Sequence, residues 1–161
     1  MRARALAVLM GACILGAALT SCSDAFFPDR PDVEIGLDFY PRTQSQPLAL
    51  PLTLRVALGS RTYQVVVDSE FASRGIDVPV LRDGTLPVQL YLIDATGDTL
   101  ATASFAQQAR TNYANWILGT VATSPPLSVC LGNPEYAVGI PLAGGVSFYV
   151  DHGSWAKDVI C

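Results

Sequence analysis

The chain has 161 residues, of which 50% are hydrophobic and 15% charged, and its formal net charge is −4. This length is enough for one domain with a sizeable core. An acidic chain is a poor partner for nucleic acid, because that affinity rests on neutralising phosphates with Lys and Arg. With a single histidine and no CxxC motif, the composition predicts no metal site.

The first 21 residues are typical of a secretory signal peptide. Arg2 and Arg4 form a short positive start, and an apolar run from Ala5 to Leu19 follows them. About 15 apolar residues are too few to cross a bilayer, which needs about 20. A positive start, a short apolar run and small residues before a cut indicate export.

The end of this run, Leu19-Thr20-Ser21-Cys22, resembles the lipobox of bacterial lipoproteins. That resemblance covers residues 1–22 only. It implies that the signal is removed before Cys22 and that Cys22 carries diacylglycerol, which would anchor the chain in the membrane of the bacterial cell envelope. Ser23 after the cysteine resembles the sorting signal for the outer membrane. The alternatives are an ordinary cleaved signal without lipid, or a cut before Cys13.

Processing would leave 140 residues with 8 basic and 14 acidic side chains, a balance of −6 (8 minus 14). This charge argues against direct adhesion to anionic lipid head groups. Both methionines are lost, which excludes a Met-rich binding groove. Apart from the lipidated cysteine, Cys130 and Cys161 remain, and the oxidising surroundings of an exported protein favour a disulfide between them. No cofactor is expected.

The mature chain divides into two parts. Residues 22–50 are acidic and rich in proline, which predicts an extended tether, although residues 33–40 alternate well enough to be a possible first strand. Residues 51–161 show apolar alternation of period two, which predicts a β-sandwich domain. The expected strands cover residues 52–58, 63–67, 76–80, 86–93, 99–105, 116–121, 127–131, 136–140 and 146–150. Residues 106–115 are expected to form a short helical turn or a crossover loop.

These strands, with no βαβ alternation, predict an all-β fold, an antiparallel immunoglobulin-like β-sandwich of about seven to nine strands with little helix. The hairpin over residues 86–105 resembles the central hairpins of immunoglobulin-like and transthyretin-like sandwiches. In residues 127–131 the leucines share one face, so Cys130 should point outward. The disulfide would then hold the C-terminal tail over the outside of a sheet.

One segment combines aromatic rings, amides and a guanidinium, a chemistry that suits a sugar or a peptide partner. This possible binding loop contains Arg110, Asn112, Tyr113, Asn115 and Trp116. The alternative is that Tyr113 and Trp116 are core residues at the start of a strand.

No catalytic residue is predicted. His152 stands beside Asp151 and Ser154, but the members of a catalytic triad converge from separate segments, so a polar turn after the 146–150 strand is the preferred interpretation. Asp94, Thr96 and Asp98 could offer oxygens to calcium, but they lack the fuller ligand set of a calcium loop, and a solvated hairpin turn is favoured.

The expected function is that of a membrane-anchored lipoprotein which presents a non-enzymatic binding or accessory module at the cell envelope. Its partners would be the membrane, through Cys22, and an envelope protein or a carbohydrate. One alternative is a carrier of a small apolar or carbohydrate ligand, in a barrel-like pocket lined by Tyr91, Phe105 and Phe148. A structural spacer is the second alternative. An enzyme would have to gather His152 with distant acids such as Asp68 or Glu70.

Overall fold

A computed structural model describes residues 32–39, 48–69, 72–79, 82–111, 113–126 and 135–156. They form nine strands and one short 3₁₀ turn, η1 (Ala143–Gly145). The strands are β1 (Asp32–Phe39), β2 (Leu52–Leu58), β3 (Arg61–Val67), β4 (Ser73–Pro79), β5 (Gly84–Ile93), β6 (Thr99–Ala109), β7 (Tyr113–Ala122), β8 (Glu135–Pro141) and β9 (Ser147–Ala156).

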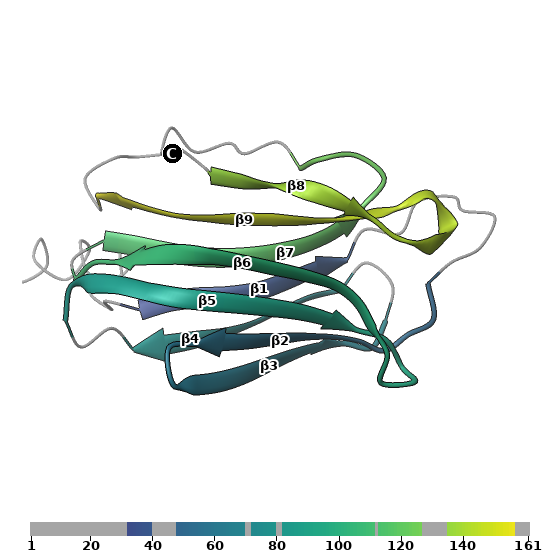
Figure 1. The fold of residues 1–161 in the computed structure, drawn as a ribbon, viewed down its shortest axis with the longest axis horizontal. Helices are drawn as coiled ribbons and strands as arrows, with labels where there is room; N and C mark the ends of the chain where they lie inside the picture. The colour runs from purple at the N-terminus through teal and green to yellow at the C-terminus, as the bar shows by residue number, and fades with distance from the viewer. Residues whose placement is uncertain are drawn as a thin grey trace, which may run out of the picture. The chain divides into compact units, whose positions relative to one another are not determined.

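The strands build two sheets, with the orders β4-β1-β7-β9-β8 and β3-β2-β5-β6 (Figure 1). All neighbouring strands are antiparallel except β1 and β7, which are parallel. The predicted all-β sandwich is therefore confirmed, with sheets that are antiparallel apart from this one pair, and the described residues contain no α-helix. The β2–β3 hairpin stays within one sheet, whereas the second and third strands of an antibody domain lie in different sheets.

Apolar alternation places the core between the sheets. In β2, Leu52, Leu54, Val56 and Leu58 are buried, and the residues between them are only partly covered. The same pattern recurs in β5 at Val88, Leu90 and Leu92. Across the sandwich β6 contacts β9, and β3 contacts β1 and β4. Side chains of both sheets thus meet in one apolar cluster.

The sequence left the place of residues 33–40 open, and the structure makes β1 an interior strand, between β4 and β7. Val33, Ile35, Leu37 and Phe39 are at most 2% exposed. Residues 32–39 are therefore the first strand that the sequence left possible within the 22–50 segment, and they belong to the sandwich. The acidic composition was misleading because Glu34, which is exposed, lies on the opposite face of the strand from this apolar set.

Two other expectations are revised. Most of residues 106–115 belong to strands, because β6 continues to Ala109 and β7 begins at Tyr113, and no helical turn separates them in the described part of this segment. The crossover alternative holds for the short link between these two strands, which passes from the four-stranded to the five-stranded sheet. The strand expected at 146–150 extends to Ala156, because β9 pairs with β7 along its whole length. The expected strand at 127–131, and with it the direction of Cys130, lies outside the described residues, as do Cys22 and Cys161.

Candidate functional site

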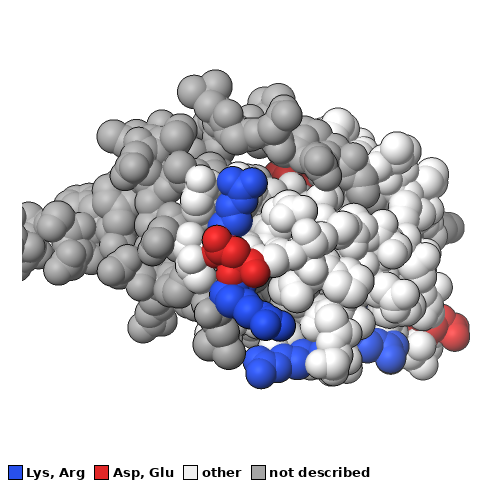
Figure 2. All heavy atoms as spheres, turned by 60° about the vertical axis from the view of Figure 1, so that its left-hand side comes forward, with Lys and Arg blue, Asp and Glu red and all other residues white. Residues whose placement is uncertain are grey.

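One end of the sandwich carries three arginines, and we refer to it as the arginine end. Arg61 follows the β2–β3 turn, Arg82 precedes β5, and Arg110 lies in the β6–β7 loop. Figure 2 brings this end forward and shows basic and acidic side chains close together on it. The strand ends that meet here are far apart in sequence, so only the folded chain assembles the site.

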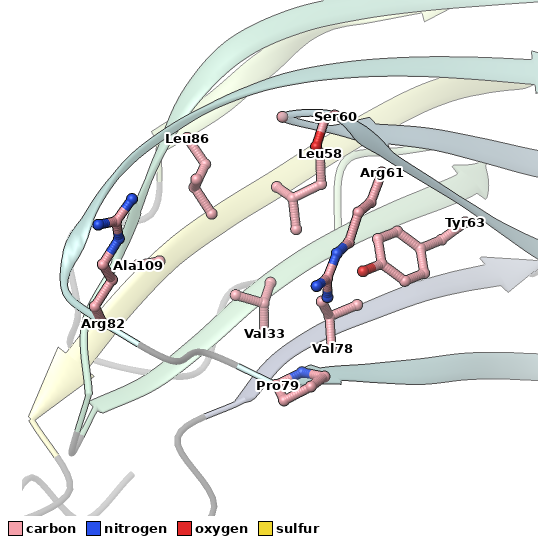
Figure 3. Close-up of a pocket in the computed structure, with 11 residues that line it drawn as sticks. Val33, Leu58, Ser60, Arg61, Tyr63, Val78, Pro79, Arg82, Leu86 and Ala109 are labelled. Carbon is pink, nitrogen blue, oxygen red and sulfur yellow. The ribbon is translucent and has the colours of Figure 1, made fainter.

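A pocket of about 300 Å³ opens at the arginine end, between the two sheets (Figure 3). This volume is at the lower end of the range for small-molecule sites. β1 and β4 contribute residues from one sheet, and β2, β3, β5 and β6 contribute residues from the other. The lining consists of Val33, Leu58, Gly59, Ser60, Arg61, Tyr63, Val78, Pro79, Arg82, Leu86 and Ala109. Most of these side chains are apolar.

The polar groups of the pocket are unusual for an acidic protein. Two arginines line it and no acid does. Arg61 and Arg82 are both exposed, and neither forms an ion pair or a hydrogen bond within the part of the chain that the structure describes. In the view of Figure 3 their guanidinium groups stand on opposite sides of the pocket. The neighbouring acids Glu34 and Asp77 alternate with lining residues and are exposed, so they lie on the outer face.

The β6–β7 loop beside the pocket is held in place by the side chain of Asn115, a β7 residue that is 3% exposed. The side-chain amide of Asn115 donates to the carbonyl oxygens of Arg110 (2.9 Å) and Tyr113 (3.1 Å). Its own oxygen accepts a hydrogen bond from the Arg110 N–H (3.0 Å). This buried amide fixes the loop, so Asn115 has a structural role there.

Asp83 ties the same loop to the start of β5. Its carboxylate accepts hydrogen bonds from the N–H and the hydroxyl of Thr111, each at 2.7 Å. The Thr111 hydroxyl, then the Thr111 N–H, and to a smaller extent the charge of Arg110 hold the pKa of Asp83 below its ordinary value. The Arg110 guanidinium lies 5.0 Å from the centre of the Tyr113 ring, a cation–π contact.

The predicted binding loop is therefore divided by the structure. Arg110 and Tyr113 stay together at the arginine end, whereas Asn115 is buried and Asn112 lies outside the described residues. Trp116 alternates to the outer face of the five-stranded sheet, where its indole N–H donates to Asp151 (3.2 Å). A Cβ on Gly153 would come within 2.6 Å of the Trp116 ring, so that ring lies close against the backbone of β9.

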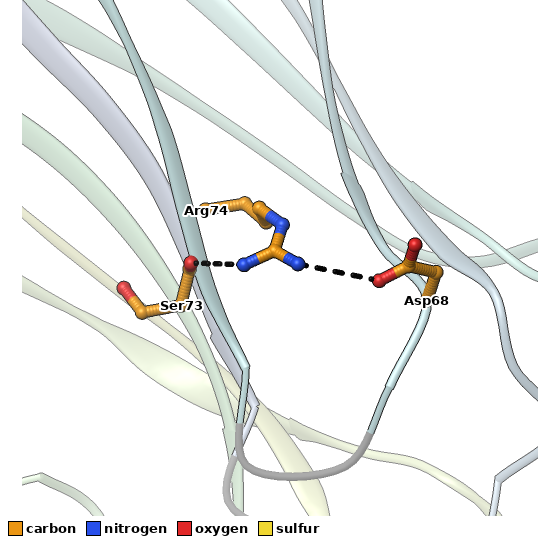
Figure 4. A network of polar contacts seen from close by, with 3 residues as sticks. All are labelled: Asp68, Ser73 and Arg74. Carbon is orange, nitrogen blue, oxygen red and sulfur yellow. Dashed lines mark hydrogen bonds and ion pairs between the residues drawn. The ribbon is translucent and has the colours of Figure 1, made fainter.

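His152 is 6% exposed, and its ring stacks on Phe105 with 3.8 Å between the ring centres. Its neighbour Asp151 lies on the opposite face of β9. Asp68 forms an exposed ion pair with Arg74 at the other end of the sandwich (3.5 Å, Figure 4), and Glu70 lies outside the described residues. The structure thus does not bring His152 and Asp68 together.

The Asp94–Asp98 segment is the β5–β6 hairpin turn. The Asp94 carboxylate accepts hydrogen bonds from the Thr96 N–H (2.8 Å), the Thr96 hydroxyl (2.6 Å) and the Asp98 N–H (3.0 Å). The Thr96 hydroxyl is the largest cause of the lowered pKa of Asp94. Gly97 takes a positive φ of 93°, which suits glycine. Within the described residues no group of three acids, histidines or cysteines could hold a metal ion.

The residues suggested for a barrel-like pocket do not line the pocket at the arginine end. Phe148 is fully buried in the core, and the Phe105 ring stacks on the ring of His152. The Tyr91 hydroxyl donates to Gln89, a neighbour on the same strand. Sequence reasoning missed Arg61 and Arg82, because each appears only as a charged residue beside a turn.

Gln107 was also missed: it is fully buried, and its amide nitrogen donates to the carbonyl oxygens of Gln108 (2.9 Å) and Gly153 (3.1 Å). It links β6 to β9 across the sandwich. No helix of the described residues has the length and hydropathy of a membrane span. In comparisons with known proteins, no family model, no curated protein and no solved structure matches the chain.

Proposed function

We propose that this protein is a lipid-anchored protein of the bacterial cell envelope whose sandwich is a non-enzymatic binding module. The pocket at the arginine end is its ligand site. The observation that carries the proposal is the apolar space between the sheets, with two arginines and no acid among its lining residues. A chain that served only as a spacer would need neither the space nor the charges.

The anchor and the pocket are linked by covalent geometry. Cys22 precedes Asp32 by ten residues, and ten residues span at most about 36 Å. Val33, at the start of β1, lines the pocket. A lipid on Cys22 would therefore keep the pocket within a short reach of the membrane surface. Two or three acyl chains hold a protein firmly, since each buried CH₂ contributes about 0.8 kcal/mol.

The anchor is tested by the intact mass of the membrane-extracted protein, measured before and after reduction. We expect a chain that begins at Cys22 and carries added acyl groups, with a gain of two hydrogens when the Cys130–Cys161 disulfide is reduced. The Cys22→Ala variant should lose the acyl mass and leave the membrane fraction. A wild-type chain found without lipid in the soluble fraction would contradict the anchor.

The pocket is tested with a photoreactive alcohol, decanol carrying a diazirine, added to vesicles that hold the full-length acylated protein. We expect the label on lining residues such as Leu58, Leu86 and Ala109. Ala109→Phe fills the pocket and should remove the label, whereas Ala106→Phe, an exposed position on the same strand, should not. Leu86→Trp fills the pocket from a half-buried position and guards against misfolding of the first variant. A wild-type protein with no label in the pocket would favour a spacer.

A further inference from the structure

We infer that the ligand is a single-chain anionic amphiphile taken from the surrounding membrane, with a fatty acid as its simplest form. The inference rests on the proposed function, since it names the ligand class of the same pocket. The alkyl chain would lie between the sheets, and the carboxylate would lie at the mouth between Arg61 and Arg82. Three properties of the pocket support this assignment.

The size of the pocket limits the apolar part of the ligand. A volume of about 300 Å³ holds about ten groups the size of a water molecule, at about 30 Å³ each. One alkyl chain of about ten carbons fills such a space, and the two chains of a phospholipid do not fit. The buried side chains Val33, Leu58, Val78 and Ala109 offer this chain an apolar wall.

The charge at the mouth selects the head group. A guanidinium presents a planar fork of N–H donors that matches a carboxylate or a phosphate. Most other charged groups of the structure already have partners: Arg74 pairs with Asp68, Arg110 lies over Tyr113, and Asp83 accepts from Thr111. Arg61 and Arg82 do not have such partners within the described residues. Since the chain as a whole is acidic, this positive site is local and would not arise from the average charge.

The position of the pocket selects the source. An alkyl chain with a carboxylate resides at a membrane surface, and the short link from Cys22 to β1 would keep the pocket near that surface. The strand that begins at the link, β1, is also a wall of the pocket. A ligand leaving the membrane would thus travel only a short distance to reach it.

The test compares two photoreactive probes of equal chain length in vesicles bearing the full-length acylated protein: diazirine decanoate and diazirine decanol. We expect the acid to label the pocket about tenfold more strongly than the alcohol, as a charge-assisted hydrogen bond implies. The double variant Arg61→Gln with Arg82→Gln should remove this preference, so that the acid labels the pocket no more strongly than the alcohol does. Arg74→Gln, an exposed arginine at the far end of β4, is the matched control and should change neither.

The outcomes separate the two proposals. Equal labelling of the pocket by acid and alcohol would overturn the anionic ligand while the pocket remained a binding site. Label from neither probe in the pocket would overturn both. Preference for the acid that survives in the double variant would also overturn the inference, because the two arginines would then not hold the head group.

Discussion

The two ends of the sandwich differ in how many of their charged residues have local partners. At the end that holds the β5–β6 turn, Asp94 accepts three hydrogen bonds, Asp38 accepts one from Ser73, and Asp68 pairs with Arg74. At the arginine end, Arg61 and Arg82 stand beside an apolar space without such partners in the described residues. Charges that are satisfied locally shape a turn, and charges left beside a cavity are available to a ligand.

The contrast extends to the side chains behind these charges. β2 carries a buried leucine at each of its ends: Leu52 near the β5–β6 turn and Leu58 in the wall of the pocket. Both pack in the core cluster, and Leu58 also lines the pocket at the arginine end. At the arginine end, hydrogen bonds of Asn115 and Asp83 therefore hold the β6–β7 loop in place, whereas the wall of the pocket is incompletely packed.

The largest expected effect comes from truncating these two leucines in turn. Leu52→Ala should reduce the free energy of unfolding by about 4 kcal/mol, near the upper part of the range for buried leucines. Leu58→Ala should reduce it by about 2 kcal/mol, because part of its surroundings is already empty. Urea unfolding followed by circular dichroism measures both. An equal loss in the two variants would mean that the pocket wall is packed as closely as the opposite end.

The role of Asn115 in holding the β6–β7 loop is tested by its replacement. Asn115→Ala removes three hydrogen bonds and leaves partly buried backbone groups of Arg110 and Tyr113 without them, which should cost about 2 kcal/mol of unfolding free energy. Hydrogen exchange should show faster opening of residues 110–114. Gln108→Ala, an exposed position on β6, is the matched amide control. Unchanged exchange in Asn115→Ala would show that the loop is held by other contacts.

Acid should weaken both ends in the same pH window. The pKa values of Asp83 and Asp94 are lowered in the folded chain, so their stabilising effect is complete above the unfolded value of about 3.9. That effect is lost as the pH falls through the lower folded values. We expect Tm to decrease as the pH is lowered from about 4. The decrease should be less steep in a variant with Asp83→Asn and Asp94→Asn. An identical acid profile in the variant would exclude these two carboxylates as the cause.

The smallest expected effect distinguishes binding from folding. The double variant Arg61→Gln with Arg82→Gln should change the free energy of unfolding by no more than about 0.5 kcal/mol, because both side chains are exposed and make no internal contact of the kinds described. Thermal unfolding of this variant beside Arg74→Gln checks the point. A large loss of stability would show that the two arginines serve the fold, and would remove them as free ligand groups.

Much of the fold was predictable because the apolar alternation of a strand is a local property. The period of two over Leu52–Leu58 and over Val88–Leu92 identifies the strand and its buried face together. The β5–β6 turn was equally predictable, since Asp94 and Gly97 close it with contacts to residues at most four positions away. Such features depend on neighbours in the sequence and not on the remainder of the chain.

The place of β1 and the length of β9 were decided by pairing with β7, a strand that is distant in sequence from β1. The local signals at these segments, prolines and acids before Val33 and a polar stretch around His152, indicated a tether and a turn. Long-range backbone hydrogen bonds and burial between the sheets overrode both signals. The candidate site depends on the tertiary structure still more, because the pocket is the space that side chains from different strands leave between them. The walls of this pocket come from six strands and its charges from two separate turns, and only the packing of one sheet on the other brings them together.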